Sequence, residues 1–222
     1  MTKLDMLTTI QKAGIMPAVR ASSADDALFA SEAVFSSGIP LVEITMTTPG
    51  AVGVISQLLR TASGVIVGAG TVLNLETARA CVEAGAGFLT SPGFDPELAE
   101  FAAQHGLAII PGALTPSEII MATKARAAFV KVFPCASLGG PSYIRALRGP
   151  FPDTPFVASG GVTQLTAADY IHAGADVLGI GSELLPREAI RNRNLRRIHE
   201  LARRFIEMVK QGRDAKLANA QH

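Results

Sequence analysis

The chain has 222 residues, of which 48% are hydrophobic and 18% are charged, and its net charge at pH 7 is +1. Such a chain can bury a large core, in one domain or in two small ones. The balanced charge argues against a nucleic-acid or membrane-surface partner, and no run of eighteen apolar residues is present to span a membrane.

The start of the chain and its cysteines indicate a reducing cytoplasm. Residues 1–14 lack the apolar segment of a secretory signal peptide. The two cysteines, Cys81 and Cys135, are too few and too far apart for a disulfide framework or a metal site. No cluster of His, Asp and Glu has metal-ligand spacing, so we expect no metal cofactor. Cys135 is interpreted as a small buried hydrophobe.

Short β-rich runs recur about every 20 to 27 residues. We expect eight strands, at residues 15–20, 41–46, 65–71, 87–92, 107–114, 129–134, 156–161 and 177–182. The intervals predict helices, with N-caps at Ser23, Asp95 and Thr115. Glu118 completes a capping box with Thr115.

These alternating units predict parallel strands and a single-domain (β/α)8 TIM barrel over residues 1–222. A first helix before residue 15 would cap the bottom of the barrel. The alternative is an open doubly wound sheet, which binds ligands where the strand order reverses. The count of eight and the even spacing favour the barrel.

A basic tail of about residues 186–222 follows the last unit. From Arg187 onward, ten Lys and Arg stand against four Asp and Glu. Apolar residues from Leu195 to Val209 recur at helical spacing. We therefore expect a C-terminal helix with a solvated basic face, the alternative being a site for a phosphate-rich partner.

A lysine interrupts the apolar run "FVKVFP" at residues 129–134, although lysine is rarely buried. Because side chains alternate along a strand, Lys131 shares its face with Phe133, and Glu43 shares its face with Thr45. Both charged groups can therefore point into the barrel lumen, near the mouth where active sites of such barrels lie.

Two hypotheses account for Lys131 and Glu43. They could form a buried ion pair, but such pairs rarely stabilise a fold more than apolar residues do. Alternatively, an apolar pocket disfavours the charged amine, and a neutral amine can attack a ketone to form a Schiff base. Glu43 would then be the general acid and base, with Glu183 as a weaker candidate.

The seventh and eighth predicted strands end in the glycine clusters "SGG" (159–161) and "GIGS" (179–182). The loops that follow strands seven and eight of TIM barrels often bind phosphate. Glycines let backbone N–H groups approach an oxyanion closely. The two clusters therefore predict a phosphate site.

Six motifs, in chain order, resemble the 2-keto-3-deoxy-6-phosphogluconate (KDPG) aldolase family. They are "LVEITMTTPGA", "VGAGTVLN", "LTSPGF", "IPGALTPSE", "FVKVFP" and "SGGVT". The family also includes 4-hydroxy-2-oxoglutarate and phosphogalactonate aldolases, and the resemblance covers about residues 10–185. It implies a (β/α)8 barrel, a homotrimer, and class I aldolase chemistry with no metal or other cofactor.

The resemblance also implies residue roles. Lys131 would form the Schiff base and Glu43 would move protons. Thr71 would hold the pyruvate carboxylate, while Pro92 and Phe133 would pack the pocket. The residues implied around the phosphate and the sugar hydroxyls are Gly160, Gly161, Gly181 and Ser182, with Ser159 near the hydroxyls.

The chain departs from some family members in its positive charges. Some members carry an arginine where this chain has Thr47, whereas others have one at the end of the first strand, like Arg20 here. We infer that Arg20 serves the carboxylate. The expected reaction is cleavage of KDPG. The alternatives are an aldolase for the galacto epimer or for 4-hydroxy-2-oxoglutarate, and a phosphosugar-binding barrel without turnover.

Overall fold

The computed structural model describes residues 1–219, so residues 220–222 of the predicted domain and tail lie outside the described part. The strands are β1 (Ile15–Val19), β2 (Leu41–Thr45), β3 (Ile66–Gly70), β4 (Phe88–Thr90), β5 (Ala108–Ile110), β6 (Gly112–Ala113), β7 (Val130–Val132), β8 (Phe156–Ser159) and β9 (Val177–Ile180). The helices are α1 (Lys3–Ala13), α2 (Ala24–Ser36), α3 (Ala51–Thr61), α4 (Leu75–Glu83), α5 (Pro96–Gln104), α6 (Pro116–Lys124), α7 (Pro141–Arg148), α8 (Ala167–Ala173), α9 (Arg187–Arg191) and α10 (Leu195–Asn219).

The strands form one parallel sheet in the order β5-β4-β3-β2-β1-β9-β8-β7-β6. Strands β5 and β6 are two parts of the fifth predicted run, separated only by Pro111, which has no N–H to donate to the ladder. Because β5 pairs with β4 and β6 with β7, this run joins the two edges of the sheet. The predicted (β/α)8 barrel is confirmed, and the open doubly wound sheet is wrong because the strand order never reverses.

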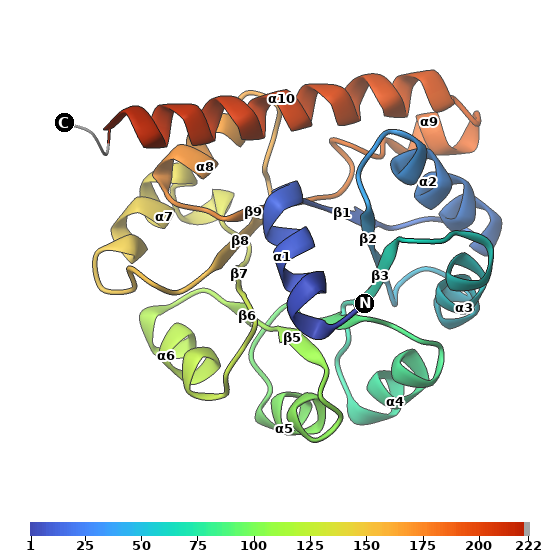
Figure 1. Cartoon of the computed structure of the whole chain (residues 1–222), viewed down its shortest axis with the longest axis horizontal. Coiled ribbons are helices and arrows are strands. Elements are labelled where there is room, and N and C mark those ends of the chain that lie inside the picture. The colour runs from blue at the N-terminus through green and yellow to red at the C-terminus, as the bar shows by residue number, and fades with distance from the viewer. Residues whose placement is uncertain (220–222) are drawn as a thin grey trace.

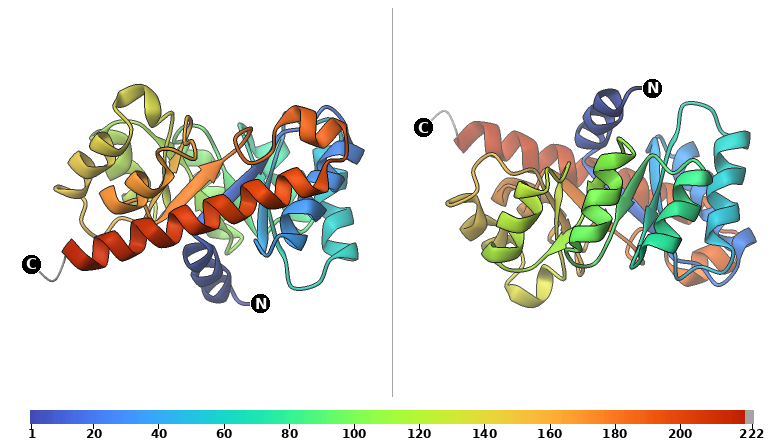
Figure 2. Two further views of the ribbon diagram at one scale, coloured as in Figure 1. Left: turned by 90° about the horizontal axis from the view of Figure 1, so that it is seen from above. Right: turned by 90° about the horizontal axis from the view of Figure 1, so that it is seen from below.

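The helices surround the barrel in chain order, and α1 lies across one end of it (Figure 1). Figure 2 shows α1 standing out from that end. The helix starts at Thr2, whose side chain accepts the N–H of Asp5 in a capping box, and it buries Met6 and Ile10. The predicted first helix therefore closes the bottom of the barrel, leaving the opposite end for a site.

The predicted helix starts are confirmed. Ser23 accepts the N–H of Asp26, and Asp95 accepts those of Glu97 and Leu98. Thr115 and Glu118 form the predicted capping box at the start of α6. Each cap satisfies N–H groups that lack partners in the first turn of a helix.

The basic tail forms α9 and α10. Helix α10 packs against α8 and α2, and it runs along one side of the barrel (Figure 1). Its apolar side chains are buried, including Ile198 and Phe205, whereas basic residues such as Arg203 and Lys210 are exposed. The helix therefore covers the barrel with its apolar stripe and turns a basic face to solvent, as its pattern predicts. No helix within residues 1–219 is long and apolar enough to cross a membrane.

Candidate active site

A cavity of about 690 Å³ lies at the carboxyl ends of the strands. Its walls come from the last residues of the strands and from the loops that follow them. All eleven residues predicted for the site line this one cavity, namely Arg20, Glu43, Thr71, Pro92, Lys131, Phe133, Ser159, Gly160, Gly161, Gly181 and Ser182. The fold thus brings together side chains that are up to 162 positions apart in the sequence.

Lys131 and Glu43 meet inside the cavity. The Nζ atom of Lys131 lies 3.8 Å from Oε1 of Glu43, and the two residues are only 9% and 3% exposed. The Lys131 amine also lies 5.5 Å from the centre of the Phe133 ring, which forms an apolar wall beside it. The arrangement presents an amine and a carboxylate to a molecule that enters the mouth of the cavity. These two groups can serve as a nucleophile and as a proton-transfer group.

Strand β3 leaves space for the Glu43 carboxylate. A side chain at Gly70 would put its Cβ atom 2.1 Å from Oε1 of Glu43, far inside van der Waals contact. Gly70 is the last residue of β3, beside Thr45 of β2 in the register of the two strands. The glycine is therefore required for the position of the carboxylate and not for backbone flexibility.

Thr71 follows β3 with a backbone φ of 59° and lines the same cavity. This left-handed conformation is rare for a β-branched residue and costs about 1–3 kcal/mol. Strain of this kind is typical of residues held in place for function. Thr71 is thus a candidate for contact with a bound molecule.

Arg20 directly follows β1, and the loop that it begins is hydrogen-bonded to the loop after β2. The N–H of Ala21 donates a 3.2 Å hydrogen bond to Oγ1 of Thr48, in the loop after β2. The Arg20 side chain itself is exposed and lines the cavity. It can therefore reach an anion at the mouth.

The loops after β8 and β9 carry the predicted glycines. Gly160 and Gly161 have φ values of 86° and 88°, and a Cβ atom at Gly161 would lie 2.4 Å from the Cβ of Ala136. The Gly181 carbonyl accepts the N–H groups of Leu184 and Leu185, so it opens a helical turn. Backbone N–H groups at the start of such a turn and in glycine loops suit an oxyanion.

Cys135 is near the cavity, but it is buried and its thiol is hydrogen-bonded. Its thiol donates to the carbonyl of Gly160 at 3.4 Å, and its sulfur lies 3.3 Å from the hydroxyl oxygen of Tyr170. Burial raises the pKa of the Cys135 thiol above its ordinary value. The group is thus protonated at neutral pH, which is typical of a structural cysteine and not of a nucleophile.

The cavity also contains residues outside the predicted set. Thr45 is buried and donates its hydroxyl to the Val19 carbonyl at 3.1 Å; its place on the Glu43 face of β2 was a signal that could have identified it. Arg187 lines the cavity too, but its position in a helix-like basic segment does not distinguish it in sequence. Glu183, the weaker acid/base candidate, lines the cavity as an exposed residue.

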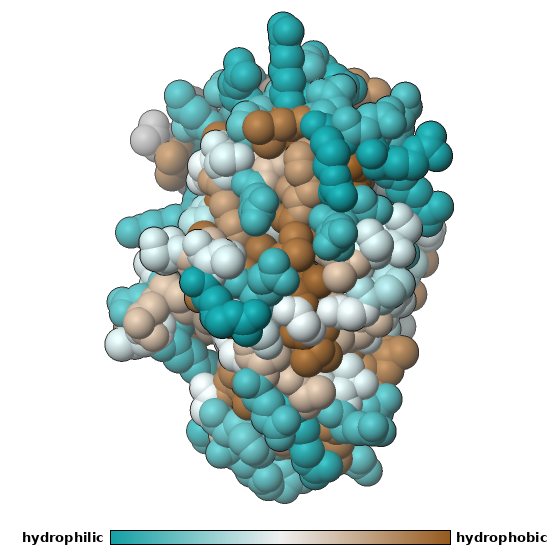
Figure 3. Space-filling model, turned by 90° about the vertical axis from the view of Figure 1, so that its right-hand side faces the viewer, coloured by the Kyte–Doolittle hydropathy of each residue, from teal (hydrophilic) through white to brown (hydrophobic). Residues whose placement is uncertain are grey.

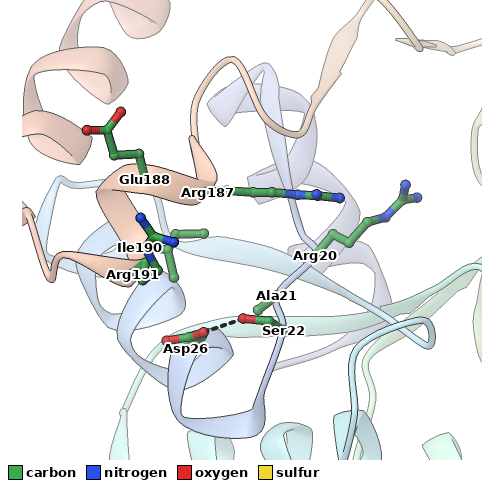
Figure 4. Close-up of a pocket in the computed structure, with 8 residues that line it drawn as sticks. All are labelled: Arg20, Ala21, Ser22, Asp26, Arg187, Glu188, Ile190 and Arg191. Carbon is green, nitrogen blue, oxygen red and sulfur yellow. Dashed lines mark hydrogen bonds between the residues drawn. The ribbon is translucent and has the colours of Figure 1, made fainter.

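A second cavity, of about 570 Å³, adjoins the first. It shares Arg20 and Arg187 with the inner cavity, so these arginines stand where the two meet. Figure 4 shows the Arg187 side chain extended toward Arg20, while Glu188 points away from both.

Comparison with known proteins gives consistent matches. A family model described as KDPG and KHG aldolase matches residues 6–201. A 2-dehydro-3-deoxy-phosphogluconate aldolase of Pseudomonas aeruginosa is 32% identical, covering 90% of this chain and 91% of that protein.

Solved structures share the fold closely. The KDPG aldolase of Legionella pneumophila, with pyruvate captured at low pH as a covalent carbinolamine intermediate, has a TM-score of 0.83. It is 31% identical, over 88% of this chain and 95% of that one. The corresponding aldolase of Zymomonas mobilis, with 3-phosphoglycerate, also has a TM-score of 0.83. It is 27% identical, over 92% and 96% of the two chains.

Proposed function

The chain belongs to the KDPG and KHG aldolase family and is a lyase, and we propose that it cleaves 2-keto-3-deoxy-6-phosphogluconate to pyruvate and glyceraldehyde 3-phosphate. The observation that carries this proposal is the buried Lys131 amine, 3.8 Å from the Glu43 carboxylate inside an open cavity. The covalent carbinolamine held by the similar Legionella enzyme supports a Schiff base.

The proposed reaction begins with Lys131. Its neutral amine attacks the C2 carbonyl of the substrate, and the carbinolamine loses water to become a protonated imine. Glu43, directly or through one water, accepts the proton of the C4 hydroxyl while the C3–C4 bond breaks. The electron pair of that bond moves into the imine and forms an enamine. Glyceraldehyde 3-phosphate leaves, C3 of the enamine takes up a proton, and hydrolysis releases pyruvate and the amine.

The remaining residues would bind the two ends of the substrate. Thr71 and Arg20 would hold the carboxylate, with Pro92 and Phe133 packing against the pyruvate part. The phosphate would lie on the two glycine loops, whose backbone N–H groups suit an oxyanion, and Ser159 would contact the hydroxyls. The residues of the phosphate loops are Gly160, Gly161, Gly181 and Ser182.

The reaction as proposed uses no metal or other cofactor, because the imine on Lys131 is itself the electron sink. Turnover is expected to be unchanged after dialysis against a strong chelator. A loss of activity that divalent cations restore would contradict this part of the proposal.

We also propose a homotrimer of single-domain chains in the cytoplasm. The buried apolar residues form one continuous core, which fits one domain. An apolar band crosses the side of the molecule that carries α3 (Figure 3), and exposed apolar bands of this kind often lie in interfaces between subunits. The free, buried thiols of Cys81 and Cys135 fit a reducing compartment. Light scattering is expected to give three times the chain mass.

Trapping with pyruvate tests the proposed function. Pyruvate and borohydride are expected to leave one reduced pyruvate adduct, seen by intact mass and mapped to Lys131, and Lys131→Ala is expected to remove it. A wild-type protein that forms no adduct would be a phosphosugar-binding barrel without this chemistry. Comparison of kcat/KM for KDPG, its galacto epimer and 4-hydroxy-2-oxoglutarate then separates the alternative substrates.

A further inference from the structure

Arg187 lines the mouth of the cavity and follows a short loop that is partly buried. It follows Ser182 by five residues and is the first residue of α9. Between them, Leu184 and Leu185 are buried and donate their N–H groups to the Gly181 carbonyl. One short loop therefore connects the predicted phosphate ligands Gly181 and Ser182, which follow β9, to Arg187 at the start of α9.

The charge of Arg187 is unused within the protein. Within residues 1–219, neither Arg187 nor Arg20 has a hydrogen bond or an ion pair to a protein group. By contrast, Arg193 in the same segment lies 3.3 Å from a carboxylate oxygen of Asp26 and stacks 4.9 Å from the Phe29 ring. Arg187 and Arg20 are thus two uncompensated cations beside one cavity.

The acidic groups around the two cavities do not neutralise this pair, and Glu43 of the inner cavity faces Lys131 instead. Asp26 in the outer cavity forms an ion pair with Arg193 and accepts a 2.7 Å hydrogen bond from the Ser22 hydroxyl. Glu188 points away from Arg187 in Figure 4. Glu183 is exposed at the mouth and forms no ion pair in the described part of the chain. Two guanidinium groups that line the same cavity, neither of them paired with a carboxylate, favour bound anions.

The proposed substrate has two anions, a carboxylate at C1 and a phosphate at C6. Arg20 extends from β1, beside β2 and its Glu43, and is therefore suited to the carboxylate. Arg187 extends from the loop of Gly181 and Ser182, on the phosphate side. We propose, on the basis of the proposed function, that Arg187 binds the distal phosphate and makes the enzyme specific for phosphorylated substrates.

Arg187 would provide this specificity because its side chain carries a full positive charge. Backbone N–H groups are uncharged and donate hydrogen bonds to a phosphate or to a hydroxyl, whereas a guanidinium adds a full positive charge and bidentate, charge-assisted hydrogen bonds that a hydroxyl cannot form. Arg187 would therefore add to the preference for phosphate that the glycine loops provide. Removal of the Arg187 side chain is therefore predicted to weaken the binding of phosphorylated ligands alone.

Binding of glycerol 3-phosphate by calorimetry tests the proposal without turnover. Arg187→Ala is expected to raise the Kd about 10–100-fold, the range of a charged hydrogen bond, and Arg187→Lys to recover part of the loss. Arg191→Ala is the matched control, because Arg191 lines only the outer cavity, and it should leave the Kd unchanged. An unchanged Kd in Arg187→Ala, or no binding by the wild type, would overturn the proposal.

Aldol addition of pyruvate gives a second readout. Arg187→Ala is expected to lower kcat/KM about 10–100-fold with glyceraldehyde 3-phosphate and to change it less than about 2-fold with glyceraldehyde. Equal losses with both aldehydes would overturn the assignment. Trapping of pyruvate should be unaffected in Arg187→Ala and weakened in Arg20→Ala. Failure of wild-type trapping would count against the proposed function, while the calorimetry still decides the role of Arg187.

Discussion

The Nζ atom of Lys131 and the nearest carboxylate oxygen of Glu43 lie 3.8 Å apart, across the lumen of the barrel. The two strands that carry them, β7 and β2, are separated in the sheet by β1, β9 and β8, so the pair forms only when the sheet closes. The distance exceeds that of a hydrogen bond. The amine is thus open to a carbonyl carbon, while the carboxylate stays within reach of one bridging water.

Substitution of Glu43 separates imine formation from proton transfer. Glu43→Gln keeps the shape of the side chain but cannot accept a proton, so turnover is expected to fall about 10²–10⁴-fold. The borohydride adduct with pyruvate should still form on Lys131. Steady-state kinetics and intact mass check the two outcomes. Near-normal turnover in Glu43→Gln, with a large loss in Glu183→Gln, would transfer the role to Glu183.

The strained backbone of Thr71 predicts a conflict between stability and binding. Thr71→Gly relieves the left-handed conformation, which costs about 1–3 kcal/mol, but it adds entropy to the unfolded chain that offsets about 1 kcal/mol. The free energy of unfolding should therefore stay equal or rise by up to about 2 kcal/mol. The pyruvate concentration needed for half-maximal trapping should rise, because the hydroxyl is lost.

Thr71→Ser is the control for that experiment, since it keeps the hydroxyl without the branch. Its trapping curve is expected to match the wild type. A Thr71→Gly protein that binds pyruvate normally, or one that is less stable, would contradict the interpretation of Thr71 as a strained ligand. Urea unfolding and the trapping curve measure the two properties separately.

Glu118 predicts a pH-dependent contribution to stability. Its carboxylate accepts the N–H groups of Leu114 and Thr115 at 2.9 and 2.7 Å, and these hydrogen bonds hold the pKa of Glu118 below its ordinary value. A lowered pKa in the folded state means that the stabilisation is present above the unfolded pKa and is lost as the pH falls through the folded pKa.

Glu118→Gln should therefore lower stability at pH 7 by about 0.5–1 kcal/mol, as the loss of a helix cap does, with solvent exposure keeping the effect small. The difference from the wild type should shrink as the pH is lowered below about 4. Urea midpoints at pH 7 and at acidic pH check this. A difference that grows on acidification would show that the carboxylate is not the stabilising form.

Features that depend on local pattern were predictable from the sequence. The helix caps, the strand runs, and the common lumen face of Lys131 and Glu43 follow from periodicity and side-chain chemistry, which act over a few residues. The break of the fifth run into β5 and β6 was not predicted, although Pro111 was a visible signal. The two-residue period of a strand does not show where the backbone hydrogen-bond ladder lacks an N–H donor.

Other features depend on contacts between distant segments. The role of Gly70 follows from a carboxylate 27 positions away in sequence, and the place of Arg187 follows from how the last loop closes over the mouth. Neither arrangement leaves a local pattern. In the sequence, a glycine at the end of a strand looks the same whether it permits a turn or leaves space for a neighbouring side chain.

That difference can be tested at Gly70. An alanine there would bring a Cβ atom to 2.1 Å from the Glu43 carboxylate, so Gly70→Ala is expected to displace the carboxylate and lower turnover about 10²-fold or more. Since Lys131 is untouched, pyruvate should still be trapped. Gly53→Ala in α3 is the matched control, because a Cβ atom there has no neighbour within 4 Å, and it should raise stability by about 0.5–1 kcal/mol with normal activity. Full turnover in Gly70→Ala would mean that Glu43 tolerates displacement and is not positioned by β3.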